Sequence, residues 1–182
     1  MTRVSFLAGA GGPWSIERID AIRGETLAQA GTLARVESPE IVPATGAVWV
    51  LSGVRSNERY LERAEREALA RVQEELGRAG SRRAALIPIH KREAWWKLAQ
   101  DERREVFGER SRHIAIGSSY LPAVARRLYH ARDLGGPFDF LTWFEFADAD
   151  TGAFDELVGR LRETEEWRYV DREVDVRLRR QA

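Results

Sequence analysis

Residues 105–146 have the sequence EVFGERSRHIAIGSSYLPAVARRLYHARDLGGPFDFLTWFEF, and this stretch decides the predicted fold. Its last third follows a Gly-Gly-Pro break and is rich in alternating aromatic side chains, which predicts a strand over residues 138–147. Both faces of that strand carry bulky side chains, as expected for a sheet that packs against helices. The stretch therefore predicts an α+β protein in which helices cover a sheet.

The segment before the break predicts two helices. The first should span residues 93–114, contain Trp95 and Trp96 near its start, and hold His113 on its apolar face. A lone histidine on such a face is more often a hydrogen-bonded core residue than a metal ligand. Adjacent tryptophans likewise pack in a core more often than against a large ligand. Residue types alone therefore leave both a core and a binding site open.

The second predicted helix follows Gly117 and runs from Ser118 or Ser119 to about residue 132. Arg126 and Arg127 leave its apolar stripe on opposite sides. Periodicity does not determine which of the two arginines, if either, faces a pocket.

Outside this stretch, apolar periods of two and about 3.6 residues predict further elements. The strands should span residues 4–8, 14–22, 47–54, 83–91 and 168–179, and the helices residues 57–76 and 150–165. Two prolines and a Thr-Gly pair make residues 35–46 a predicted surface loop. Because strand–helix–strand order occurs twice, we expect two ferredoxin-like halves, residues 1–92 and 93–182, whose sheets meet as an antiparallel β-barrel with outer helices.

Lys91 ends an apolar row formed by every second residue of the strand predicted over residues 83–91. Its ammonium group could extend to water along the strand, or it could bind a buried carboxylate. Spacing alone favours water.

The composition is that of an ordinary globular protein, with 43% hydrophobic and 32% charged residues among 182. The 29 basic and 29 acidic residues give a formal net charge of zero, which argues against nucleic acid or an anionic membrane as a partner. The N-terminal residues lack the hydrophobic core of a signal peptide, and no apolar run approaches transmembrane length. We therefore expect a cytoplasmic protein.

The sequence contains no cysteine, which excludes disulfides, thiolate zinc sites, thiol catalysis and covalent c-type haem attachment. Its histidines are His90, His113 and His130. A multi-histidine metal site would need nearly all of them. Any iron would therefore enter more readily inside a cofactor that supplies its own nitrogen ligands.

The sequence resembles the chlorite dismutase family, specifically its short lineage, in three runs: RAALIPIHKREAWWKLAQDERREVFGERSRHIAIGSSYLPAVARRLYH, PFDFLTWFEFA and LRETEEWRYVDREVDVRL. These runs cover most of the chain after Tyr60, and the resemblance is weaker over the N-terminal strands. It implies a homodimer of α+β barrels, with one non-covalent haem b in the C-terminal half of each protomer.

The resemblance also implies roles for single residues on both sides of the haem. His113, in SRHIA, matches the proximal iron ligand. Arg126, the first arginine of ARRLYH, matches the mobile distal arginine. Gln73, in ARVQEEL, matches the distal glutamine that can hold that arginine.

Four further residues match the family near the haem. Lys91 and Glu166 match a proximal lysine and glutamate linked to the ligand histidine, although Glu165 next door leaves the register of the glutamate open. Trp95 and Trp96 match a tryptophan pair near the haem edge.

The activity implied by the resemblance is conversion of the small anion chlorite to chloride and dioxygen, through a ferryl/hypochlorite intermediate and formation of an O–O bond. A second enzyme that fits the resemblance is a coprohaem decarboxylase of bacterial haem synthesis; it would need a tyrosine against a propionate, and Tyr60, Tyr120 and Tyr129 are available. A distal arginine is not its usual feature. The chain could also be a haem carrier or sensor without turnover, or a ferredoxin-like dimer without a cofactor.

Overall fold

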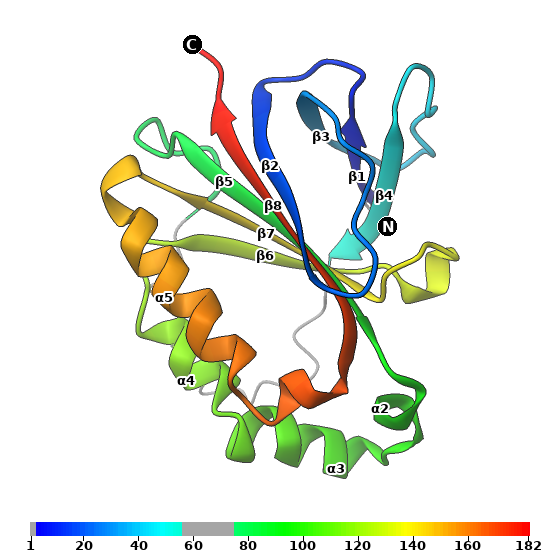
Figure 1. Ribbon diagram of the computed structural model, residues 1–182, viewed down its shortest axis with the longest axis vertical. Helices are drawn as coiled ribbons and strands as arrows, with labels where there is room; N and C mark the ends of the chain where they lie inside the picture. The colour runs from blue at the N-terminus through cyan, green and yellow to red at the C-terminus, as the bar shows by residue number, and fades with distance from the viewer. Residues whose placement is uncertain (1–2, 56–74) are drawn as a thin grey trace.

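One closed antiparallel barrel organises the computed structural model, which describes residues 3–55 and 75–182 (Figure 1). The strands of these residues are β1 (Arg3–Ala8), β2 (Trp14–Arg23), β3 (Thr32–Ser38), β4 (Trp49–Arg55), β5 (Arg83–Lys91), β6 (Ala125–His130), β7 (Phe140–Phe146) and β8 (Val170–Arg180). Every neighbouring pair is antiparallel. The predicted α+β barrel is confirmed.

The strand order repeats within the barrel. Going round it, the strands follow the order β4-β1-β3-β2 and then β8-β5-β7-β6. Each set thus has the order fourth, first, third, second, which is the order of a ferredoxin-like sheet. The β2–β8 and β4–β6 pairings join the two sets. By strand order β5 groups with β6–β8, although the predicted boundary at residue 92 places it in the first half; that boundary stays a prediction.

The helices described lie in the C-terminal part of the chain. They are α2 (Glu93–Lys97), α3 (Gln100–Arg104), the π-helical turn η1 (Glu105–Arg110), α4 (His113–Ser118) and α5 (Thr151–Arg162), together with 3₁₀ turns η2 (Arg132–Leu134), η3 (Asp148–Asp150) and η4 (Glu166–Tyr169). Helices α4 and α5 lie beside each other on one side of the barrel (Figure 1).

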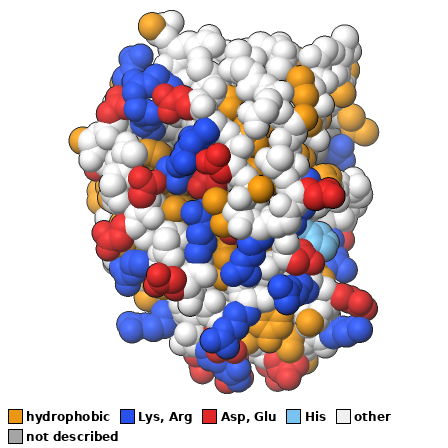
Figure 2. Space-filling view, in the orientation of Figure 1, with side chains coloured by type: hydrophobic (Ala, Val, Ile, Leu, Met, Phe, Trp, Pro, Cys, Tyr) orange, Lys and Arg blue, Asp and Glu red, His pale blue; other side chains and the backbone are white. Residues whose placement is uncertain are grey.

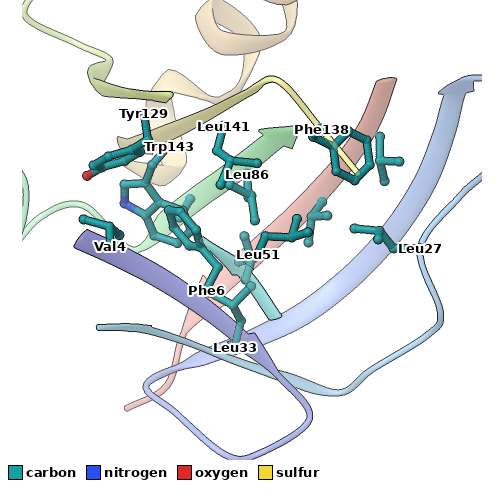
Figure 3. Packing of buried hydrophobic residues seen from close by; sticks show 14 of the residues in the cluster. Val4, Phe6, Leu27, Leu33, Leu51, Leu86, Tyr129, Phe138, Leu141 and Trp143 are labelled. Carbon is teal, nitrogen blue, oxygen red and sulfur yellow. The ribbon is translucent and has the colours of Figure 1, made fainter. Parts of the chain in front are cut away.

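The inside of the barrel is filled by side chains (Figure 3). Phe6, Tyr129 and Trp143 lie at its centre, and the Phe6 ring is 5.8 Å from that of Tyr129 and 5.5 Å from that of Trp143, between centroids. Each of these three side chains is no more than 2% exposed. Because a small barrel packed in this way leaves no room for a large ligand, a cofactor has to lie on its outer face.

A second apolar cluster covers the outer face of β5 and β7. The predicted stripe of helix α5 packs against it, and all four side chains of that stripe are buried: Phe154, Leu157, Val158 and Leu161. Ile116, on α4, packs at the edge of the same cluster. Helix α5 and part of α4 therefore cover this outer face of the sheet.

The helix predicted over residues 118–132 is wrong. Only a short turn follows α4, and Ala125–His130 form β6, which pairs with β7 along its whole length and with the end of β4. Arginine and leucine favour a helix locally, so the residues themselves suggested one. The strand forms because β7 and β4 supply backbone partners on its two edges, a tertiary effect that overrides local propensity.

Three other predictions need comment. The helix over residues 93–114 is wrong as a single element, because extended backbone at Leu98 and Ala99 separates α2 from α3, and Arg112 separates η1 from α4. The loop predicted over residues 35–46 overlaps β3. Leu33 is the only buried residue of β3, so this strand shows no alternating apolar pattern that could have predicted it. The helix over residues 57–76 falls almost entirely outside the described residues.

Candidate functional site

A change of backbone direction places His113 at the first position of α4. Arg112, just before it, has φ of +49°, a left-handed conformation that costs a residue with a side chain on the order of 1 kcal/mol. Ser111 anchors the turn: its N–H donates to the Val106 carbonyl at 2.9 Å, and its Oγ accepts the backbone N–H of Glu166 at 2.8 Å. Two segments far apart in sequence are thereby tied together at the imidazole.

Glu166 connects His113 to Lys91. Its Oε2 lies 2.7 Å from His113 Nδ1, and its Oε1 lies 2.5 Å from Lys91 Nζ. The lysine and glutamate side chains are 2% and 4% exposed, and that of the histidine is 12% exposed. This is a buried ion pair with the imidazole as a third member, in which both carboxylate oxygens have a partner.

The charge of Glu166 fixes how His113 can act. Burial opposes ionisation, but the positive charge of Lys91 and the contact with His113 outweigh it and lower the pKa of Glu166 from 4.5 to about 2. The carboxylate is thus an anion at neutral pH and accepts a proton held on Nδ1. Nε2 is left as the nitrogen that can bind a metal, and the hydrogen bond at Nδ1 makes it a stronger donor to iron.

The ammonium group of Lys91 is enclosed rather than extended to water. It lies 3.4 Å from the centre of the Trp95 ring, a cation–π contact, while the backbone N–H of Lys91 donates to buried Asp139 at 2.7 Å. Of the two possibilities that the sequence left open, binding to a buried carboxylate is the one observed. Of the two adjacent glutamates, Glu166 contacts His113 and Lys91, whereas Glu165 pairs with Arg110 at 3.1 Å on the surface.

Removing one member of the pair should destabilise the fold. Lys91→Met leaves the Glu166 anion buried beside the imidazole alone, and we expect the free energy of unfolding in urea to fall by about 3 kcal/mol. Lys97→Met is the matched control, since Lys97 forms a surface pair with Glu93 and should change little. The double variant Lys91→Met/Glu166→Gln should regain part of the loss; a double variant as unstable as the single one would contradict the ion-pair account.

Acid should remove the same contribution. Because the folded-state pKa of Glu166 is about 2, below its ordinary 4.5, the stability it adds is complete above pH 4.5 and is lost as the pH falls toward 2. Between pH values well above 4.5 and well below 2, the contribution of ionised Glu166 to the free energy of unfolding should change by roughly 3 kcal/mol. Urea unfolding of the wild type and of Glu166→Gln at pH 7 and pH 3 should show the advantage of the wild type shrinking at pH 3. An advantage that does not change with pH would contradict the assigned charge.

Arg126 and Arg127 extend to opposite sides of β6. Among the described residues, a Cβ placed on Gly117, one turn after His113 on α4, would meet only Arg126 Nη1, at 3.9 Å. The guanidinium of Arg126 is thus beside the histidine helix, on the outer face of the sheet. Arg127 instead binds Glu75 at 2.9 Å and lines a cavity at one end of the barrel, next to Tyr129. Strand alternation, unavailable to the helical prediction, separates the two arginines.

The two tryptophans differ in their contacts: Trp95 is packed in the core, whereas the Nε1 donor of Trp96 has no hydrogen-bond partner among the described residues. Trp95 is 3% exposed and packs edge-on against Tyr169. Trp96 stacks on Phe140, with ring centres 6.0 Å apart, and its Nε1 is buried without a hydrogen-bond partner among the described residues. A buried donor of this kind is costly unless a bound group accepts its proton. Trp96 therefore indicates a ligand with an acceptor atom at this edge of the site.

Contacts join four of the seven predicted site residues, His113, Glu166, Lys91 and Trp95, while Trp96 stacks on Phe140 and Arg126 lies beside α4. The seventh, Gln73, lies outside the described residues. Periodicity missed Ser111 and Asp139, whose contacts hold the backbone of Glu166 and Lys91. No local pattern identifies them, since each acts on a residue distant in sequence.

Comparison with known proteins decides the family. The sequence profile of chlorite dismutase matches residues 24–181, most of the chain. The chain belongs to the chlorite dismutase family. Among its relatives, a crystal structure of a dimeric chlorite dismutase from Nitrobacter winogradskyi is 52% identical, with a TM-score of 0.90, and the match covers 98% of this chain and 99% of that one.

Two other chlorite dismutases are less similar in sequence. A chlorite dismutase from Ideonella dechloratans is 35% identical over 86 residues, which are 47% of this chain and only 28% of that protein. A mutant chlorite dismutase from Candidatus Nitrospira defluvii is 19% identical with a TM-score of 0.72, covering 99% of this chain and 91% of that one, and so shares the fold.

The surface of this family member is electrostatically mixed. On the face shown in Figure 2, basic and acidic side chains are interspersed over much of the molecule. Within the described residues, no helix is long and apolar enough to span a membrane.

Proposed function

We propose that this chlorite dismutase family protein binds non-covalent haem b and converts chlorite to chloride and dioxygen. The observation that carries the proposal is that His113, on α4, and Arg126, on β6, both lie at the same helix. His113 is fixed at Nδ1 by a buried carboxylate, which leaves Nε2 to bind iron, and Arg126 extends a cation to the same helix one turn further on.

The residues present fit a haem. His113 would bind its iron, and the indole N–H of Trp96, buried and without a partner among the described residues, would donate to an acceptor at the haem edge. When bound, the haem supplies the iron at which chlorite is cleaved and the oxygen atoms are joined. The barrel core is filled, so the haem would lie outside it, on the C-terminal side that carries His113 and Arg126.

Arg126 suits the handling of a small anion. A guanidinium stays charged at every relevant pH and can bind an oxyanion through two parallel N–H donors. Chlorite is a monoanion, and its products include another anion, chloride. One mobile cation in a largely apolar space would hold the substrate and still let chloride leave.

Lys91 and Glu166 set the properties of the histidine. The glutamate anion accepts a hydrogen bond from Nδ1–H and makes Nε2 more electron-rich, which would favour the higher oxidation states of a bound iron. Lys91 keeps that carboxylate ionised by holding its pKa low. The triad His113–Glu166–Lys91 thus acts on the reaction through the iron ligand and does not touch the substrate.

We also propose that the protein works as a homodimer, as the Nitrobacter winogradskyi relative is a dimeric chlorite dismutase. The cytoplasmic location and the absence of a nucleic-acid or membrane partner stay predictions. Gln73 stays a predicted partner of Arg126.

The decarboxylase has less support. It needs a tyrosine directed at a propionate, and two of the three candidates have their hydroxyl groups occupied elsewhere. Tyr129 OH binds Arg35 at 2.8 Å on the inside of the barrel, and Tyr120 OH binds Arg160 at 3.2 Å. Tyr60 lies outside the described residues. A carrier or sensor without turnover would share the histidine but has no evident use for Arg126.

The decisive experiment adds chlorite to haem-loaded protein on an oxygen electrode, after a visible spectrum has verified the bound haem. Oxygen released in near one-to-one yield with chlorite is the expected result. Bound haem with no oxygen release would overturn chlorite conversion and favour the decarboxylase and the carrier. Failure to take up haem would overturn the cofactor assignment as well.

A further inference from the structure

Trp167 lies against the imidazole of His113. Its ring is nearly parallel to the His113 ring, at 26°, with centroids 6.3 Å apart. It follows Glu166 directly in the sequence and is 6% exposed. Its backbone is held at both ends, since its N–H donates to the Thr164 carbonyl at 3.2 Å and its carbonyl accepts from Arg23 at 2.6 Å. The indole thus occupies one fixed position beside the candidate iron ligand.

The polar end of Trp167 meets a carboxylate. Its Nε1–H donates to Glu173 Oε2 at 2.7 Å, and Glu173 is 1% exposed. The other carboxylate oxygen accepts from Arg162 Nε at 2.8 Å, so Glu173 and Arg162 form an ion pair at the polar end of the indole. A buried indole needs only one acceptor, and a backbone carbonyl would serve without the cost of burying a charge. Trp143 in the barrel core also donates to a buried carboxylate, that of Glu145, so what distinguishes Trp167 is that its ring also lies beside His113.

Three tryptophans lie near the candidate haem site, and their electrostatic surroundings differ in sign. Lys91 Nζ lies 3.4 Å from the Trp95 ring centre, and the guanidinium of Arg132 lies 3.7 Å from that of Trp96. A cation on a ring face disfavours removal of an electron from that ring. Trp167 has a carboxylate at its N–H instead. An anion stabilises positive charge on the indole, so Trp167 is the most readily oxidised of the three.

We propose that Trp167 is a one-electron donor to the haem, used when hypochlorite escapes before the O–O bond forms and the haem keeps two oxidising equivalents. This inference rests on the proposed function. In the step, the indole ring gives one electron to the haem and becomes a tryptophan radical. The Nε1 proton stays in the hydrogen bond or moves to Glu173, so no other acceptor is needed. The haem then holds one oxidising equivalent instead of two.

The test uses hydrogen peroxide, so that it does not depend on chlorite turnover. Peroxide is a two-electron oxidant: when its O–O bond breaks, one oxygen leaves as water and the haem would keep the other together with two oxidising equivalents, one of which Trp167 would take up by giving an electron. Haem-loaded protein is mixed with peroxide, frozen within milliseconds to seconds, and measured by electron paramagnetic resonance. We expect a radical signal that narrows when the protein carries ring-deuterated tryptophan.

Two variants and a control assign the signal. Trp167→Phe keeps an aromatic ring against His113 and should lose the tryptophan radical while keeping its haem. Trp49→Phe is the matched control, because Trp49, on β4, donates to the Ala28 carbonyl between β2 and β3, and the signal of this variant should equal that of the wild type. Glu173→Gln retains an acceptor without charge, and the radical yield should fall while the haem content stays the same.

The outcomes separate this inference from the proposed function. If haem is bound and chlorite yields oxygen, but peroxide gives no tryptophan radical, the donor role is overturned and the proposed function stands. A tryptophan radical that persists in Trp167→Phe also overturns the donor role. If the protein takes up no haem, the proposed function itself fails.

Discussion

Replacing His113 with alanine is expected to give a folded protein that loses most of its haem. The imidazole is the candidate iron ligand, and Glu166, which orients it, binds at Nδ1 and cannot take its place. The barrel core does not include His113, so the fold should survive. The measurement is haem content per protomer, from the visible spectrum after purification, together with circular dichroism to verify folding.

A control and a rescue sharpen this result. His90→Ala removes an imidazole that is 45% exposed and bound to Asp171, and it should leave haem content unchanged. Imidazole added to His113→Ala should restore haem binding, because a free ring can occupy the space that the side chain leaves. Normal haem retention in His113→Ala without added imidazole would contradict the ligand assignment.

Replacing Arg126 with alanine is expected to leave haem bound and to slow chlorite turnover by about a hundredfold, the usual effect of removing one charged or polar donor from a reacting anion. Hypochlorite that Arg126 no longer retains should escape, so the enzyme should also inactivate earlier. Oxygen yield per chlorite, and hypochlorite captured by a chlorinatable dye, measure the two effects.

The neighbouring residue provides the matched control. Arg127→Ala removes the same charge from the same strand, but from the side chain that binds Glu75 at the end of the barrel. It should leave turnover close to that of the wild type. Equal losses in the two variants would show that charge or strand stability, and not the position of Arg126, governs the rate. Full oxygen yield from Arg126→Ala without hypochlorite-dependent inactivation would contradict the role of Arg126.

Two elements next to the candidate site could be predicted from the spacing of apolar residues within one segment. The alternation over residues 138–147 correctly gives β7, and the stripe of residues 150–165 correctly gives the buried face of α5. Only the resemblance pointed to the predicted site residues, because a lone histidine, a lysine at the end of a strand and a pair of tryptophans have ordinary structural roles in most proteins.

Patterns within one segment could not give the contacts between segments. The ion pair of Lys91 and Glu166 joins the end of β5 to η4, 75 residues away, and spacing within either element carries no information about it. The choice of Glu166 over Glu165 depends on which of two adjacent side chains faces His113. Ser111 contributes to this choice by binding the backbone of Glu166.

The sequence by itself determined the class of fold, the positions of most strands, the burial of α5 and, through resemblance, the set of residues to examine. The tertiary structure alone decided that Ala125–His130 form a strand, and with it which arginine accompanies His113. One physical reason explains why the sequence was enough for the first set of features and not for the second. Local periodicity records which side chains of one segment share a face, whereas strand pairing and buried charge pairs depend on partners that only the closed barrel brings within reach.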